Sequence, residues 1–151
     1  MANPQEKTPP ALRITRTIPA PPQQVFKAWT DPEALKKWFA PTDQHRTSVP
    51  LLELEVGGRY RIEMRQDDKV YIVVGVYQEI RPPNRLVFTW RWENEPDHGD
   101  AGDTLVTLEL KPHGAGTELT LTHERFVSEQ KREEHAHGWT GCLNSLERFL
   151  S

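Results

Sequence analysis

The sequence is poor in cysteine, in long apolar runs and in net positive charge. Cys142 is the single cysteine among 151 residues, so an internal disulfide is excluded and a reducing compartment is the simplest expectation. The longest apolar run, 70–77, is too short to span a bilayer, and the first residues lack the apolar stretch of a secretory signal. We therefore expect a cytoplasmic protein without a membrane span. The net charge of −3 argues against broad nucleic-acid binding, which needs a basic face.

Catalytic and metal-binding motifs are lacking as well. Six histidines are present, but neither an HExxH nor a CxxC spacing occurs. His135 and His137 are two residues apart on an expected helix, so they point about 200° apart and cannot share one ion. We expect no metal and no cofactor. Cys142 is interpreted as a small spacer, like the nearby Gly138 and Gly141, rather than as a nucleophile.

What remains is a chain of ordinary single-domain size. A chain of this length buries about 68–70% of its unfolded surface, which is enough to form a core without a metal or a disulfide. Residues 1–11 are rich in proline and polar side chains and are expected to form a flexible tail. Residues 12–151 are expected to form one domain.

Residues 12–38 predict a strand and two short helices. Apolar and polar residues alternate over 12–18, which is typical of a strand. Pro22 suits the first turn of a helix, and Asp31 can cap a second helix that begins at Pro32. Phe26, Trp29 and Trp38 are the expected anchors of these helices, closing one end of the domain.

From residue 51 to 125 the hydrophobic period is two, which predicts about six strands in an antiparallel meander. The first of these strands is expected over 52–56, before a turn at Gly57-Gly58. The strand over 70–80 is apolar on both faces and is expected to be central. The acidic loop 94–103 is expected to be solvated. The outward arginines Arg59, Arg61 and Arg65 are expected to meet Glu63 and neighbouring acids.

The last segment returns to the helical period. Ser128 can cap a helix, and its apolar stripe comprises Ala136, Trp139, Leu143, Leu146 and Leu150. A sheet with one apolar face must be covered, and this helix is the only element long enough to do so. The prediction is an α+β helix-grip fold: a curved antiparallel sheet of about six to seven strands wrapped on a long C-terminal helix, with two short helices after the first strand.

Five short motifs occur in a characteristic order. They are APP…VFKAWTDP (20–32), LKKW (35–38), VGGRY (56–60), PPNRL leading to Thr89-Trp90 (82–90), and HGW followed by Leu143 and Leu146 (137–146). Together they resemble the START-like (SRPBCC) superfamily, and within it single-domain proteins like the activator of heat-shock protein 90 ATPase. The resemblance covers roughly residues 12–150. It implies a deep cavity between sheet and C-terminal helix, used across the superfamily for lipids, sterols, polyketides and other apolar ligands.

The candidate ligand-binding residues point toward this expected cavity. The apolar ones come from two strands and the last helix: Tyr60, Met64, Trp90, Trp92, Trp139 and Leu143. The polar ones are Arg16, His123 and His135, whose burial without a partner would cost about 1–3 kcal/mol each. They either orient an anionic or hydroxylated ligand, or Arg16 pairs with a carboxylate and the histidines reach water.

Three classes of function follow. The favoured one is binding of a small, largely apolar or lipid-like molecule without chemistry. The second, which the START-like resemblance implies, is a polyketide cyclase or aromatase-like enzyme, with His123 and His135 as the acid–base candidates. The third is a co-chaperone or stress-response interaction protein. The resemblance implies a further N-terminal domain in the chaperone activators themselves, which we do not expect in this chain, so this class is the least favoured. Homodimerisation through an exposed sheet face stays open.

Overall fold

A computed structural model describes residues 9–93 and 103–151 of the chain. Seven strands form one antiparallel sheet in the order β1-β7-β6-β5-β4-β3-β2. The strands are β1 (Leu12–Ile18), β2 (Arg46–Leu52), β3 (Arg59–Gln66), β4 (Lys69–Arg81), β5 (Arg85–Trp92), β6 (Thr104–His113) and β7 (Gly116–Glu124). The helices are α1 (Pro22–Thr30), α2 (Pro32–Trp38) and α3 (Glu129–Leu150). The predicted helix-grip class is confirmed.

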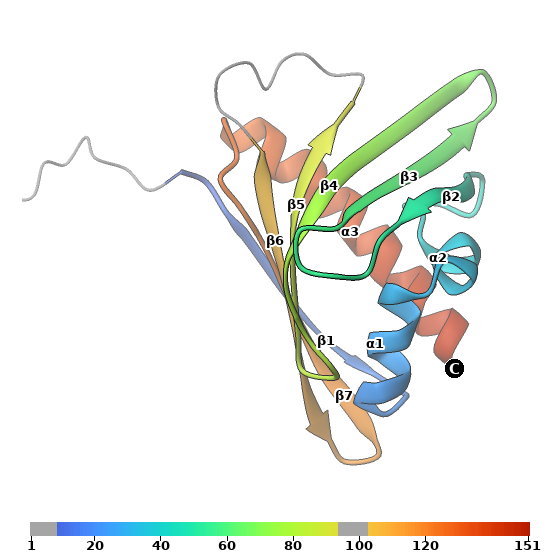
Figure 1. The fold of residues 1–151 in the computed structure, drawn as a ribbon, viewed down its shortest axis with the longest axis vertical. Coiled ribbons are helices and arrows are strands. Elements are labelled where there is room, and N and C mark those ends of the chain that lie inside the picture. Colours follow the sequence, from blue (N-terminus) through green and yellow to red (C-terminus); the bar gives the residue numbers. More distant parts are fainter. Residues whose placement is uncertain (1–8, 94–102) are drawn as a thin grey trace, which may run out of the picture.

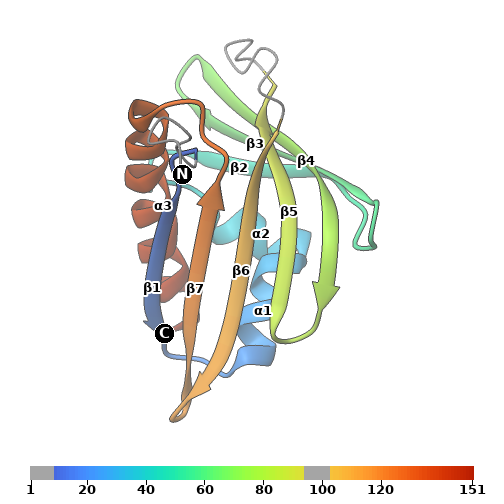
Figure 2. The same ribbon diagram turned by 90° about the vertical axis from the view of Figure 1, so that its left-hand side faces the viewer.

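The sheet curves around the helices. All three helices lie on the same side of the sheet, and α3 runs along its length beside β1 (Figures 1 and 2). Irregular register in β4–β5, between Tyr77 and Glu79, and in β2–β3, between Ser48 and Leu51, accompanies the bending. The space between sheet and α3 therefore forms the interior of the molecule.

The helices begin where the sequence predicts. The Asp31 side chain accepts a hydrogen bond from the Glu33 N–H, 3.1 Å away, and Pro32 occupies the first turn of α2. The Ser128 hydroxyl accepts one from the Lys131 N–H at 3.2 Å. The Trp38 indole N–H donates to the Ala28 carbonyl at 2.9 Å, which fixes α2 against α1.

The prediction of a strand over residues 52–56 is wrong. The sheet strand in this region is β2, and the chain leaves the sheet after Leu52. Leu54 and Val56 are 45% and 68% exposed, and Gly57 has a positive φ of 87° in the turn that follows. The hydrophobic pattern does not reveal β2, because it contains Pro50 and polar residues, which an edge strand tolerates more easily than a central one.

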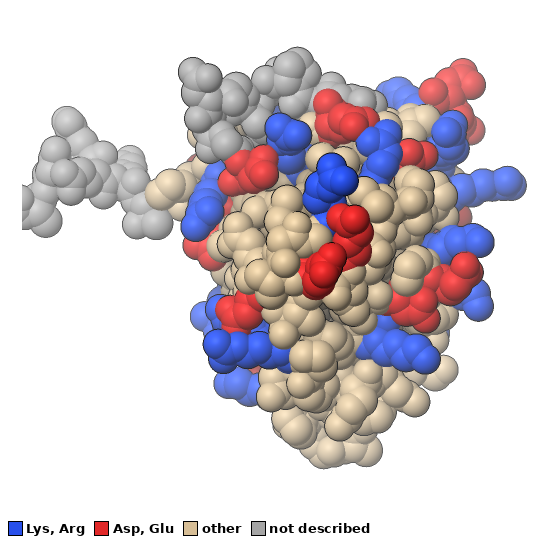
Figure 3. Space-filling view, in the orientation of Figure 1, with Lys and Arg blue, Asp and Glu red and all other residues tan. Residues whose placement is uncertain are grey.

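The predictions of a central strand and of outward arginines agree with the structure. β4 pairs with β3 on one side and β5 on the other, so the expected central strand is confirmed. Arg61 pairs with Glu63 at 2.9 Å and with Glu93 at 2.6 Å, as expected of the outward arginines. Figure 3 shows basic and acidic side chains interspersed over the upper and middle parts of the face it presents, whereas the lower end shows neither.

The two regions predicted to be irregular are the N-terminal tail and the acidic loop. Residues 1–8 of the predicted tail lie outside the described residues, whereas the Pro10 carbonyl accepts a hydrogen bond from the Phe126 N–H at 3.2 Å. Most of the acidic loop, 94–102, also lies outside the described residues. Within the parts of the chain that the structure describes, no helix is long and apolar enough to cross a membrane.

Two glycines of α3 provide a matched test of this architecture. A Cβ at Gly141 would overlap the Pro41 carbonyl oxygen, whereas a Cβ at Gly138 would meet no atom within 4 Å. We predict that Gly141→Ala lowers the free energy of unfolding by about 1–3 kcal/mol through overpacking. Gly138→Ala should raise it by about 0.5–1 kcal/mol, because alanine favours a helix interior over glycine. Urea denaturation of both variants measures the difference, and equal effects would contradict the placement of α3.

Candidate ligand pocket

Several aromatic rings pack together between α3 and the sheet. The Trp139 ring from α3 lies 4.9 Å from the Trp90 ring of β5, measured between ring centroids. Phe39, in the connection after α2, lies 5.8 Å from Trp139 and 6.2 Å from Trp90. Trp29 of α1 completes the group at 6.0 Å from Trp139. The tryptophan-bearing side of β5 thus faces α3, as the sequence predicts.

A buried histidine connects α3 to three strands. The Trp139 indole N–H donates to His123 Nδ1 at 2.9 Å, and His123 Nε2 lies 2.7 Å from the Thr104 hydroxyl oxygen. That hydroxyl donates to the Trp90 carbonyl at 2.9 Å. Because an indole nitrogen can only donate, His123 Nδ1 is an acceptor, and the ring proton is assigned to Nε2. His123 is therefore neutral and joins β5, β6 and β7 to the helix.

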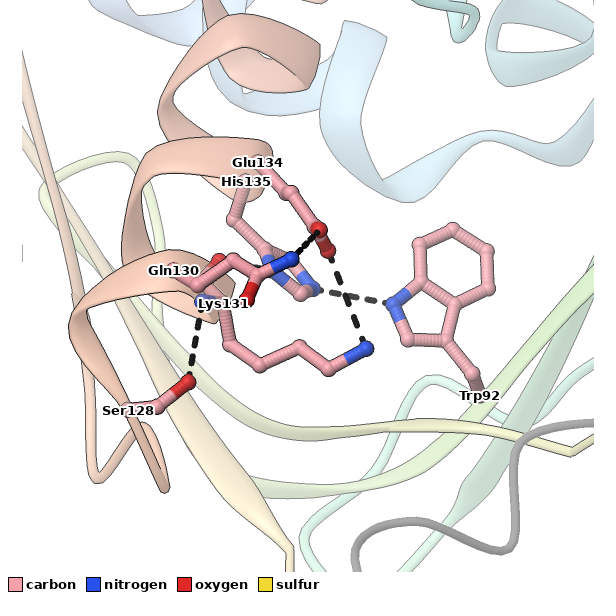
Figure 4. A network of polar contacts seen from close by, with 6 residues as sticks. All are labelled: Trp92, Ser128, Gln130, Lys131, Glu134 and His135. Carbon is pink, nitrogen blue, oxygen red and sulfur yellow. Dashed lines mark hydrogen bonds and ion pairs between the residues drawn. The ribbon is translucent and has the colours of Figure 1, made fainter.

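A second histidine, His135 of α3, accepts a hydrogen bond from Trp92 in the same way. The Trp92 indole N–H donates to His135 Nε2 at 2.9 Å, and His135 Nδ1 lies 2.7 Å from the Lys131 carbonyl oxygen (Figure 4). The same reasoning assigns the proton to Nδ1, so His135 is neutral too. On the same turns of α3, the Lys131 ammonium lies 3.7 Å from the Glu134 carboxylate.

Between these groups lies a pocket of about 190 Å³. Its lining consists of Phe39, Pro41, Met64, Tyr71, Trp90, Trp92, Glu134, His135, Gly138, Trp139 and Cys142. We call it the outer pocket. An apolar cavity of about 150 Å³ is known to hold a benzene molecule, so this volume suits a small ring compound. It is below the roughly 300–1,000 Å³ of sites for drug-sized ligands.

Gly138 keeps one wall of the outer pocket open. Its missing side chain leaves a space in which an added Cβ would touch no atom within 4 Å. One turn further along α3, Cys142 is buried and closes that side. Burial raises the pKa of the Cys142 thiol to about 12, against a smaller opposing effect of a backbone hydrogen bond with Ala40. The thiol is therefore neutral at physiological pH.

The structure brings five of the nine predicted binding residues to the outer pocket. They are Met64, Trp90, Trp92, His135 and Trp139. His123 and Leu143 are fully buried in the core and do not line the pocket. Arg16 does not line the pocket either. Its guanidinium donates to Asn144 at 2.8 Å and pairs with Glu147 at 3.4 Å. The carboxylate partner considered for Arg16 from the sequence is thus present.

Tyr60 is the remaining predicted residue, and it lies beside the outer pocket rather than in it. Its hydroxyl donates to the Thr89 carbonyl at 2.6 Å. Burial raises the pKa of Tyr60 well above its usual value of 10, so this hydroxyl stays protonated. Tyr60 lines a second, much smaller cavity of about 20 Å³, which we call the inner pocket.

Sequence reasoning missed several residues of the outer pocket. Phe39 and Pro41 belong to the connection between α2 and β2, where no hydrophobic period marks a direction. Tyr71 lies in a stretch that is apolar on both faces, so alternation does not assign the side to which it points. Gly138 was interpreted as a spacer, and only its position next to the inward-facing Trp139 could have suggested an open wall.

Two buried indole groups are unsatisfied. The N–H groups of Trp29 and Trp90 are the only buried side-chain nitrogen or oxygen atoms without a hydrogen-bond partner among residues 9–93 and 103–151. An unsatisfied buried donor costs about 1–3 kcal/mol. Within the same residues, no group of three His, Cys, Asp or Glu side chains is placed to hold a metal ion.

Comparison with known proteins identifies the family. The family model described as "Activator of Hsp90 ATPase homolog 1-like protein" matches residues 19–151. The chain belongs to this family. Membership in the activator of Hsp90 ATPase homolog 1-like family is consistent with ligand binding or a related role, and it confirms the resemblance seen in the motifs. No curated protein matches the chain.

Solved structures share the fold over nearly the whole chain. A protein from Chromobacterium violaceum is 29% identical, with a TM-score of 0.83, and the match covers 93% of this chain and 96% of that one. A protein from Rhodobacter sphaeroides is 25% identical, with a TM-score of 0.76 and coverages of 93% and 91%. An AHSA1 protein from Silicibacter pomeroyi shares the fold at 23% identity, with a TM-score of 0.78 and coverages of 92% and 96%.

The raised pKa of Cys142 predicts slow chemistry at this thiol. Because the thiolate is the reactive form, native protein at pH 8 should react with iodoacetamide at least about 100-fold more slowly than protein unfolded in urea. The native rate should rise as the pH approaches 11. Alkylation followed by mass spectrometry measures both rates, and rapid native labelling at pH 8 would contradict the burial of Cys142.

Proposed function

We propose that this protein binds a small, largely apolar, neutral ring compound in the outer pocket. The observation that carries the proposal is the cavity of about 190 Å³ between Trp90, Trp92, Trp139 and the bare backbone of Gly138. Ring faces and edges offer wide contact to another ring at little cost in side-chain entropy. Such a pocket binds a rigid ring better than a flexible chain of the same volume.

The size of the pocket narrows the ligand class expected from the sequence. A volume of about 190 Å³ accommodates one ring with a short substituent, whereas an extended lipid chain would protrude from it. For a ligand of eight to ten non-hydrogen atoms, we expect a dissociation constant on the order of 10 μM to 1 mM. The lipid-like ligand considered from the sequence is therefore less favoured than a compact one.

The charges at the pocket favour a neutral ligand. Glu134 is the one formally charged residue among the described residues that line it, and the Lys131 ammonium already lies 3.7 Å from its carboxylate. An anionic ligand would meet the Glu134 carboxylate at the mouth. Both ring nitrogens of His135 are engaged with Trp92 and Lys131, which supports a positioning role for this histidine rather than proton transfer.

A larger side chain at position 138 would occupy the outer pocket and so tests the proposal. We predict that Gly138→Leu weakens binding of ethylbenzene at least about tenfold, because the leucine side chain occupies the space of the ligand. Isothermal titration calorimetry and the ligand-induced rise in melting temperature measure the loss.

The matched control is His137→Leu. His137 lies on the exposed face of the same helix, so this variant adds a leucine to α3 away from the pocket and should bind ethylbenzene as the wild type does. If ethylbenzene fails to bind the wild type, or binds Gly138→Leu equally well, the outer pocket is not the ligand site.

A further inference from the structure

The inner pocket adjoins the outer pocket and shares two residues with it. Phe39 and Trp90 line both cavities. The inner pocket measures about 20 Å³, and a cavity of roughly 10–15 Å³ is enough for one water molecule. It therefore has room for a single oxygen-sized group, but not for a ring.

Both unsatisfied indoles of the described chain line this inner pocket. The protein has five tryptophans, and three of them donate their N–H group to a defined acceptor: Trp38 to Ala28, Trp92 to His135 and Trp139 to His123. The other two, Trp29 and Trp90, have no partner and belong to the same small cavity. Native proteins leave few buried donors unpaired, so two of them around one cavity indicate an absent acceptor.

The acceptor that fits is neutral. No lysine, arginine or histidine is present among the described residues that line the inner pocket. A carboxylate placed there would lose its hydration without gaining a counter-charge. A carbonyl or ether oxygen loses far less and can accept from both indoles.

We propose that the inner pocket receives the acceptor oxygen of the ligand whose ring occupies the outer pocket, with Trp90 and Trp29 as its donors. The ligand class is thus a small ring compound that bears a carbonyl or ether oxygen. This inference rests on the proposed function of the outer pocket. Phe39 and Trp90, whose ring centroids are 6.2 Å apart, line both pockets.

A pair of ligands that differ only in the acceptor provides the test. Acetophenone and ethylbenzene have the same ring and a two-carbon chain, but only acetophenone carries a carbonyl oxygen. We expect acetophenone to bind five- to tenfold more tightly, as one or two net hydrogen bonds allow. In ¹H–¹⁵N spectra, both compounds should perturb the Trp90 signal, because Trp90 lines the outer pocket. Only acetophenone should shift the Trp29 indole proton downfield and move that of Trp90 further downfield than ethylbenzene does.

Two variants locate the effect. Trp90→Phe removes one donor and should reduce the preference for acetophenone to less than about twofold. Trp38→Phe is the matched control, because Trp38 lines neither pocket and donates its N–H group to the Ala28 carbonyl, and it should retain the preference. If Trp90→Phe does not fold, the wild-type preference and indole shifts decide the question.

The outcomes separate the two proposals. Equal binding of both compounds, with no downfield shift of the Trp29 and Trp90 indole protons that is specific to acetophenone, overturns the acceptor-oxygen inference and leaves the outer pocket as a ligand site. Persistent contacts of these two indoles with a long-lived water, unchanged by acetophenone, assign the inner pocket to water and overturn the inference as well. Failure of both compounds to bind overturns the proposed function and the inference together.

Discussion

The hydrogen bond from the Trp139 indole to His123 determines where α3 lies on the sheet. His123 is fully buried, so each of its ring nitrogens requires a partner, and the partners come from α3 and β6. Because Thr104 passes the network on to the Trp90 carbonyl, one chain of donors and acceptors joins helix and sheet. A rotation or shift of α3 would break this chain inside the core, where water cannot replace the lost partners.

The outer pocket is a consequence of this arrangement. The network fixes the Trp139 ring against Trp90, and the neighbouring Gly138 contributes no side chain to the space beside them. At Gly141 the same helix instead touches the Pro41 backbone, where no larger residue fits. The cavity therefore lies next to Gly138, where α3 has no side chain, and ends near Gly141, where α3 packs closely against the Pro41 backbone. The resulting space is about the size that one small ring needs.

The sequence predicts the parts of this fold that have a regular hydrophobic period. The alternation in β5 places Trp90 on the inner side, and the stripe of α3 identifies Trp139 as its partner. β2 was misplaced because Pro50 and polar neighbours hide its alternation. The partners of His123 could not be predicted, since Thr104 and Trp139 come from separate elements and only the register of β6 against β7 brings them together. Phe39 and Pro41 lie in a connection, where periodicity carries no information.

The family places this chain among proteins with the same two layers, and its own residues decide what the space between the layers can hold. Xenon tests that space most directly, because it enters dry apolar cavities without any polar recognition. Diffraction from crystals of the protein kept under xenon pressure should show one strong peak between Trp90, Trp139 and Gly138. Crystals that show no xenon there, or a site closed by the surrounding side chains, would contradict the existence of a ligand pocket under α3.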